Sequence, residues 1–87
     1  MSSMLLASSS KRLRPLSSLA AGARGVVHHI AARGADRVER LMALGVTTGA
    51  PVQVMQTFPG VVFVCDQTEL AVERAVADAI LIDPAEE

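Results

Sequence analysis

Short runs in which apolar and polar residues alternate fill much of this chain after residue 23, and such runs are typical of β-strands with one buried face. The first run covers Arg24–Ile30, where strict alternation places His28 and His29 on opposite faces. The run at residues 61–65 is almost wholly apolar, so we expect it to be the central strand. Further strands are predicted at residues 52–58, 68–72 and 80–82.

The hydrophobic period changes to that of a helix between the first two strands. Val38, Leu41 and Met42 follow the spacing i, i+3, i+4, so they line one helical face. Asp36 is expected to cap the start of this helix. Gly45 is expected to end it, because glycine takes the left-handed conformation without a steric penalty. The pattern therefore predicts one amphipathic helix of about ten residues.

The order of these elements predicts the architecture. Residues 47–51 and 59–60 carry turn signals, and the alanine-rich stretch 74–79 favours one or two helical turns. Short strands with one helix after the first fit a closed barrel better than an open sheet, because closure leaves no unpaired strand edge. The predicted fold is mainly β with short helices, namely a small SH3-like β-barrel of about five strands.

The first fifteen residues differ in character from the rest. They are rich in serine and basic residues and lack a hydrophobic period, so they cannot bury enough apolar surface to offset the entropy lost on ordering. We expect a flexible N-terminal tail over residues 1–15 and a single barrel domain over residues 16–87. An organellar targeting segment is the alternative for the tail, which contains no acidic residue.

The composition bears on where the protein is expected to reside and on which side chains could form contacts. Cys65 is the single cysteine, so it has no partner for an internal disulfide, and no apolar run reaches the roughly 18 residues of a membrane span. We therefore expect a cytoplasmic protein without direct membrane insertion. Phe58 and Phe63 are the only aromatic residues and the largest apolar side chains available for core or contact. A homo-oligomer is an open alternative, because a thin core gains stability from self-association.

Charge is distributed unevenly along the chain. Residues 1–34 carry five basic residues and no acid, whereas residues 35–87 carry three arginines against nine acids, a net charge of −6. The basic part is interpreted as a solvated leader, with phosphate or anionic lipid as the alternative partner. Nucleic acid is not an expected partner, because the barrel region is acidic and lacks a pair of exposed aromatic residues.

Few residues of the chain have side chains suited to catalysis or metal binding, and none form a recognisable catalytic set. We therefore expect that the protein is not an enzyme and binds no cofactor. Cys65 is expected to be a buried, inert strand cysteine. His28 and His29 are expected to point apart, so they could not chelate one ion together. An alternative metal site would combine one histidine with Cys65 and an acid such as Asp66 or Glu69. No tightly bound metal is expected, and weak binding by the histidines or Cys65 is left open.

Three stretches follow the order and spacing of a known family. They are Leu16-Ser17-Ser18-Leu19 through Gly22-Ala23-Arg24-Gly25-Val26-Val27, then Arg37-Val38-Glu39-Arg40-Leu41-Met42-Ala43-Leu44-Gly45-Val46-Thr47-Thr48-Gly49-Ala50-Pro51-Val52, and Leu70-Ala71-Val72-Glu73-Arg74-Ala75-Val76-Ala77-Asp78-Ala79-Ile80-Leu81-Ile82. Together they resemble the FeoA family, the small partner proteins of bacterial ferrous-iron uptake. Thr48 stands where the family often has proline, and Glu73 where a basic residue is usual.

The resemblance implies a non-enzymatic SH3-like barrel that docks on a FeoB-type membrane transporter. Such a protein would be peripheral to the inner membrane through its partner. The same fold occurs as the C-terminal domain of DtxR-type metal-dependent repressors. The alternative function is therefore a metal-responsive regulatory module that interacts with such a repressor.

The chemistry of individual residues suggests where a partner would bind. Phe58 and Pro59 lie at a predicted hairpin tip, where an exposed apolar group marks a docking patch. Met55 lies on the more polar strand face, and methionine is common at adaptable interfaces. Arg37 and Arg40 lie on the helix side away from the apolar stripe. Each has an ordinary alternative role, since Phe58 can cap the core and the arginines can keep the helix soluble.

Overall fold

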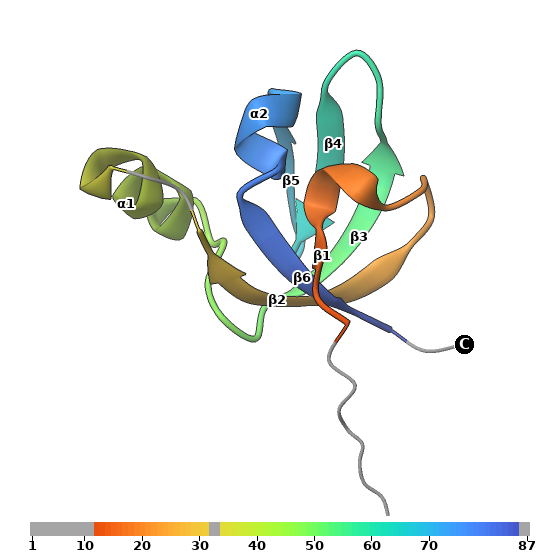
Figure 1. The fold of residues 1–87 in the computed structure, drawn as a ribbon, viewed down its shortest axis with the longest axis horizontal. Coiled ribbons are helices and arrows are strands. Elements are labelled where there is room, and N and C mark those ends of the chain that lie inside the picture. Colours follow the sequence, from red (N-terminus) through yellow and green to blue (C-terminus); the bar gives the residue numbers. More distant parts are fainter. Residues whose placement is uncertain (1–11, 32–33, 86–87) are drawn as a thin grey trace, which may run out of the picture.

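The computed structural model of the chain describes residues 12–31 and 34–85. Its main feature is one six-stranded sheet in the order β1-β6-β2-β3-β4-β5, with all neighbouring strands antiparallel. The strands are β1 (Arg14–Pro15), β2 (Arg24–Ile30), β3 (Pro51–Gln56), β4 (Val61–Cys65), β5 (Thr68–Val72) and β6 (Ile80–Pro84). A 3-10 turn η2 (Leu16–Ser18) and two helices, α1 (Ala35–Ala43) and α2 (Arg74–Ala77), complete the fold (Figure 1). The predicted mainly β class with short helices is confirmed.

The sheet curls round a core without closing. Among the residues that the structure describes, the edge strands β1 and β5 have no partner on their outer sides. η2 and α2 lie inside the curl and contact each other, with the Ser17 hydroxyl donating a hydrogen bond to the Asp78 carboxylate. β1 is only two residues long, and so short an edge offers little backbone for closure or for pairing with another chain. Because Arg14 and Pro15 form this strand, the folded domain begins earlier than the expected boundary at Leu16, while the expected tail up to residue 11 lies outside the described residues.

Apolar side chains alone fill the inside of the curl. Phe63 is the largest of them and is fully buried, and no polar or charged side chain of residues 12–31 and 34–85 is buried with it. The core consists of Leu16, Leu19, Val27, Leu41, Val46, Val52, Val54, Val61, Phe63, Cys65, Ala77, Ile80 and Ile82. Burial of this apolar surface is therefore the main source of stability.

The alternation in β3 and β4 follows the predicted pattern up to the hairpin between them. Val52 and Val54 are buried, as are the alternate positions of β4. β3 ends at Gln56 instead of continuing to Phe58, and residues 57–60 form the connection to β4. The register of β3 against β4 shifts between Val54 and Gln56. β4 was expected to be the central strand, but it lies next to the edge strand β5, and β2 and β3 occupy the middle of the sheet.

Helix α1 begins differently from the sequence-based prediction. Gly34 occupies the position before the helix, and no side chain caps it. Asp36, the predicted cap, lies inside the first turn instead. Its negative charge there still complements the positive end of the helix dipole.

The end of α1 agrees with the prediction for Gly45. This glycine has a positive φ of 103° and donates its N–H to the carbonyl oxygen of Met42 at 3.0 Å. The N–H of Val46 donates to the carbonyl oxygen of Leu41, also at 3.0 Å. These two bonds form a Schellman motif, and both Leu41 and Val46 are buried beside it.

The apolar stripe of α1 is only partly covered. α1 extends away from the curled sheet (Figure 1). Leu41 is buried, but Met42 is 50% exposed and Leu44 is 46% exposed. The helix is therefore attached through its C-terminal end and leaves part of its apolar face open to solvent.

Glycine is required where β2 and β6 meet at Gly25. A Cβ atom on Gly25 would lie 2.5 Å from the carbonyl oxygen of Asp83 and 2.7 Å from Cγ2 of Ile82. Gly25 pairs with Val52 of β3 and with Pro84 of β6 at the same time. The absence of a side chain lets β6 approach β2 closely at a position where β3 pairs with the other edge.

The two phenylalanines provide a test of this core. Replacing Phe63 by alanine should lower the free energy of unfolding by about 3–5 kcal/mol, because it removes the largest buried side chain and leaves a cavity. Phe58→Ala is the matched control and should change it by less than about 0.5 kcal/mol, because Phe58 is 79% exposed. Urea denaturation of both variants measures the difference, and equal losses would contradict the assignment.

Candidate functional site

The hairpin between β3 and β4 presents the most exposed large apolar side chain among the described residues. Phe58 is 79% exposed at the tip, and Met55, at the register shift of β3, is 51% exposed. Pro59 follows Phe58 and is also exposed. We call Met55, Phe58 and Pro59 the hairpin surface. The predicted location of all three residues on an accessible surface agrees with the structure, whereas a role for Phe58 in capping the core does not.

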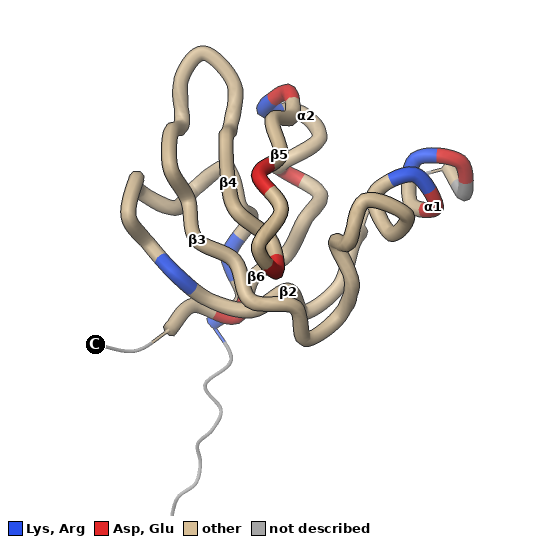
Figure 2. The backbone as a smooth tube through the Cα atoms, turned by 180° about the vertical axis from the view of Figure 1, so that it is seen from behind, with Lys and Arg blue, Asp and Glu red and all other residues tan. Residues whose placement is uncertain are grey.

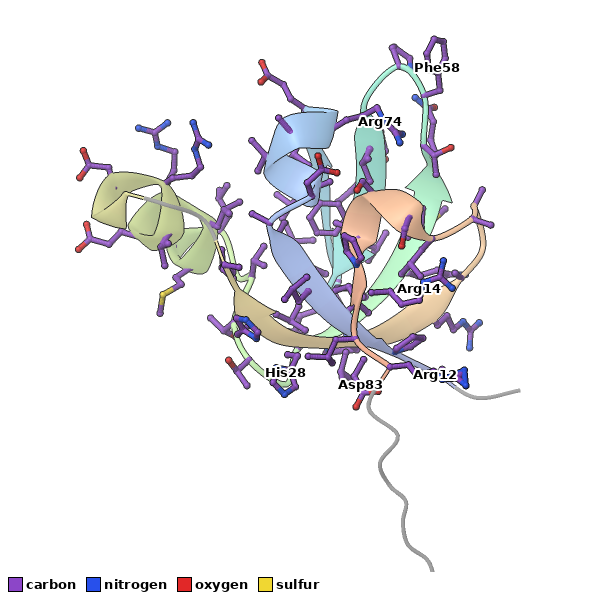
Figure 3. All side chains as sticks on the ribbon, in the orientation of Figure 1. Arg12, Arg14, His28, Phe58, Arg74 and Asp83 are labelled. Carbon is purple, nitrogen blue, oxygen red and sulfur yellow. The ribbon has the colours of Figure 1, made fainter. Side chains whose placement is uncertain are left out.

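An arginine that the sequence-based reasoning did not single out supports this hairpin. Nη1 of Arg74, the first residue of α2, donates a hydrogen bond to the carbonyl oxygen of Thr57 at 2.7 Å (Figure 3). Arg74 also lines a shallow depression together with Pro59 and Glu73. The sequence carries no signal for this contact, because Thr57 and Arg74 are 17 positions apart. The bond connects the hairpin to α2 and restricts its movement.

Arg37 and Arg40 lie on a different region of the molecule. Both are exposed on α1, which stands well apart from the β3–β4 hairpin (Figures 1 and 2). Met42 of the same helix, which the sequence pattern placed on its apolar face, is exposed, as is Leu44, which follows the helix. The five predicted contact residues therefore fall into two separate groups, and the structure does not bring them together.

A β-bulge in β2 brings the two histidines together. The pairing of β2 with β6 shifts register between Val27 and His29, so the alternation of faces is interrupted. Both histidine side chains are exposed, and their Nδ1 atoms lie 2.8 Å apart. The ring centroids are 5.1 Å apart. The prediction that His28 and His29 point apart is therefore wrong, because it assumed a regular strand.

The turn before β3 forms hydrogen bonds with the backbone of this bulge. The N–H of Gly49 donates to the carbonyl oxygen of Val27 at 2.7 Å, and the N–H of Val27 donates to that of Ala50 at 2.9 Å. The hydroxyl of Thr48 donates to the carbonyl oxygen of His28 at 3.1 Å. Three hydrogen bonds with one turn thus fix the backbone on which the histidine rings stand.

Cys65 is buried away from solvent, as predicted. Its Sγ donates a weak hydrogen bond to the carbonyl oxygen of Gly45 at 3.4 Å. Burial raises the pKa of the Cys65 thiol, and the neighbouring Asp66 carboxylate raises it further. Among residues 12–31 and 34–85, no group of three or more His, Cys, Asp and Glu side chains could hold one metal ion. The alternative site of a histidine, Cys65 and an acid is therefore not assembled.

The helices of the described segments are too short to cross a bilayer, which takes about 18 consecutive apolar residues.

The curled sheet, the short helices and the exposed hairpin define a small SH3-like module. The FeoA domain family matches residues 14–84, which is most of the 87-residue chain. The chain therefore belongs to the FeoA family. This family is linked to ferrous iron transport, and its members are small accessory proteins, not a known class of enzyme.

Solved structures agree with this assignment. The FeoA protein of Chlorobium tepidum is 34% identical, with a TM-score of 0.73 over 84% of this chain and 72% of that one. The FeoA of Stenotrophomonas maltophilia, solved with zinc and described as a prokaryotic SH3 domain protein, is 22% identical, with a TM-score of 0.70 over 78% of this chain and 87% of that one. No curated protein matches the chain by sequence.

A transcriptional repressor shares the fold alone. The chain covers 44% of a manganese-dependent transcriptional repressor at 16% identity, with 87% of this chain aligned and a TM-score of 0.80. The chain thus spans less than half of that repressor.

The surroundings of Cys65 predict an unreactive thiol. In the folded protein at pH 8, its reaction with a thiol-specific reagent should be at least about tenfold slower than in the urea-unfolded chain, because burial and the raised pKa both reduce the accessible thiolate. Absorbance of the released chromophore measures both rates. The unfolded chain serves as the control, and equal rates would show that Cys65 is accessible.

Proposed function

We propose that this chain is an accessory protein of ferrous iron uptake that acts by docking on the cytoplasmic portion of a FeoB-type transporter. Membership of the FeoA family supports the link to iron transport. The relative from Stenotrophomonas maltophilia is described as a proposed activating factor of bacterial ferrous iron transport. The proposal includes no catalytic step by this chain, since its contribution is a contact surface.

The exposed Phe58 is the observation that carries the docking proposal. An aromatic side chain left 79% exposed forgoes a transfer free energy of about 1.5–3 kcal/mol, which a partner recovers by burying it. Met55, three residues before Phe58 on the same hairpin, is 51% exposed and adds a flexible apolar side chain that adapts to a partner's shape. Aromatic residues are also enriched among the residues that dominate binding energy at protein interfaces.

The support of the hairpin by Arg74 favours binding further. A loop that is already held in place loses less conformational entropy when a partner binds. The hydrogen bond from Arg74 to Thr57 provides this restraint at 2.7 Å. Arg37 and Arg40, on α1, would take part only through a second contact region. We therefore assign the main contact to the hairpin surface.

Binding to a detergent-solubilised FeoB-type transporter from the same cells tests the proposal. Phe58→Ala should weaken binding by about 30-fold, as expected for loss of a contact worth roughly 2 kcal/mol. Leu44→Ala is the matched control, because Leu44 is 46% exposed on α1, and should change affinity by less than about twofold. Surface plasmon resonance with the tagged chain immobilised measures both affinities. Failure of the unmodified chain to bind, or equal losses in both variants, would refute docking through the hairpin.

The similarity to a repressor supports a second candidate function. The chain aligns with a portion of a manganese-dependent transcriptional repressor at a TM-score of 0.80. On this alternative, the chain is a metal-responsive regulatory module that binds a DtxR-type repressor in trans. Measuring the binding of the unmodified chain to such a repressor separates the two functions, since recovery of a repressor without a transporter would favour the alternative.

A further inference from the structure

The two histidine rings of the β2 bulge form a pair that the docking surface does not use. His28 and His29 are both exposed, and their Nδ1 atoms lie 2.8 Å apart (His28 is labelled in Figure 3). Imidazole nitrogen is a preferred ligand of divalent transition metals. We propose that His28 and His29 together bind one divalent transition metal ion through both Nδ1 atoms.

The separation of the two nitrogens selects the geometry of the ion. Metal–imidazole bonds are about 2.0–2.1 Å long, so two such bonds at a right angle place their nitrogens about 2.8–3.0 Å apart. A tetrahedral angle would place them about 3.3 Å apart. The observed 2.8 Å matches the right angle of square-planar or octahedral coordination. Cu²⁺ and Ni²⁺ prefer these geometries, whereas tetrahedral Zn²⁺ requires the rings to move apart.

Metal binding through both Nδ1 atoms requires a change of tautomer in one of the two rings. A hydrogen bond between two Nδ1 atoms requires one ring to carry its proton on Nδ1 and the other ring to accept it. When the ion binds, the first ring takes the tautomer with its proton on Nε2, and both Nδ1 lone pairs become available.

The backbone beneath the pair is already in place. Adjacent residues of a regular strand face opposite ways, and the register shift in β2 interrupts this alternation where His28 and His29 stand. The turn residues Thr48 and Gly49 hold this bulge by the hydrogen bonds described above. The N–H of Ala31 adds a bond to the carbonyl oxygen of Ala79 at 2.7 Å on the far side. Little backbone ordering is therefore left for the metal to induce.

Two protein ligands make this a weak, exchangeable site. The described residues offer no third His, Cys, Asp or Glu within reach, so water fills the remaining coordination positions. Structural metal sites usually have four protein ligands and bind far more tightly. The pair is suited to reversible binding at the surface of the protein.

Titration of the full-length chain with Ni²⁺ tests the proposal. Isothermal titration calorimetry should give one ion per chain, and His28→Ala and His29→Ala should each weaken binding by roughly tenfold or more, as losses at metal sites do. Thr47→Ala is the control, because Thr47 is an exposed residue of the adjacent turn, and should leave the affinity unchanged. Thermal unfolding of each variant confirms that it folds.

Nuclear magnetic resonance gives an independent measurement of where the metal ion binds. Paramagnetic Ni²⁺ should broaden the ring signals of His28 and His29 first, together with the amides of residues 47–50. Unchanged affinity in both histidine variants, or broadening centred elsewhere in the chain, would overturn the proposal. The double variant should still bind the transporter, so the outcomes of this test and of the docking test are separate.

Discussion

The shape of this protein depends on the way β2 is shared between two neighbouring strands. Its first half pairs with β3 along one edge and with β6 along the other. A Cβ atom on Gly25 would lie 2.5 Å from a carbonyl oxygen of β6, so the close approach of β6 to β2 requires glycine at this position. The sheet curls, and the apolar core fills the inside of the curl. The same strand carries the bulge that joins the histidines, so fold and candidate metal site depend on one element.

The two phenylalanine side chains differ in solvent exposure, and this difference indicates different roles for them. Phe63 and Phe58 are chemically identical, yet the first is fully buried and the second is 79% exposed. The first stabilises the fold, and the second is available to a partner. A small domain buries a modest share of its surface, so a large apolar group left outside forgoes stability that the fold could have used. This argument, joined to membership of the FeoA family, is the basis of our proposal that the hairpin surface docks on a partner.

Much of the fold could be predicted from local patterns. The strands at Arg24–Ile30, Val61–Cys65 and Thr68–Val72, the glycine that ends α1 and the buried Cys65 all agree with the structure. These features depend on the preferences of a few consecutive residues. The predicted faces of the histidines and the predicted length of β3 were wrong, because each depends on how a neighbouring strand pairs with the segment.

Local patterns were enough to establish the class of fold, the order of most elements and the family, because alternation, turn residues and motif spacing are properties of neighbouring residues. Which exposed groups share a surface depends instead on how the elements pack in three dimensions. That packing separates Arg40 from Phe58 and ties Arg74 to the hairpin. It also brings His28 and His29 within 2.8 Å of each other. The physical reason is that a register shift and a long-range hydrogen bond are settled by the pairing of distant segments, which no local pattern encodes.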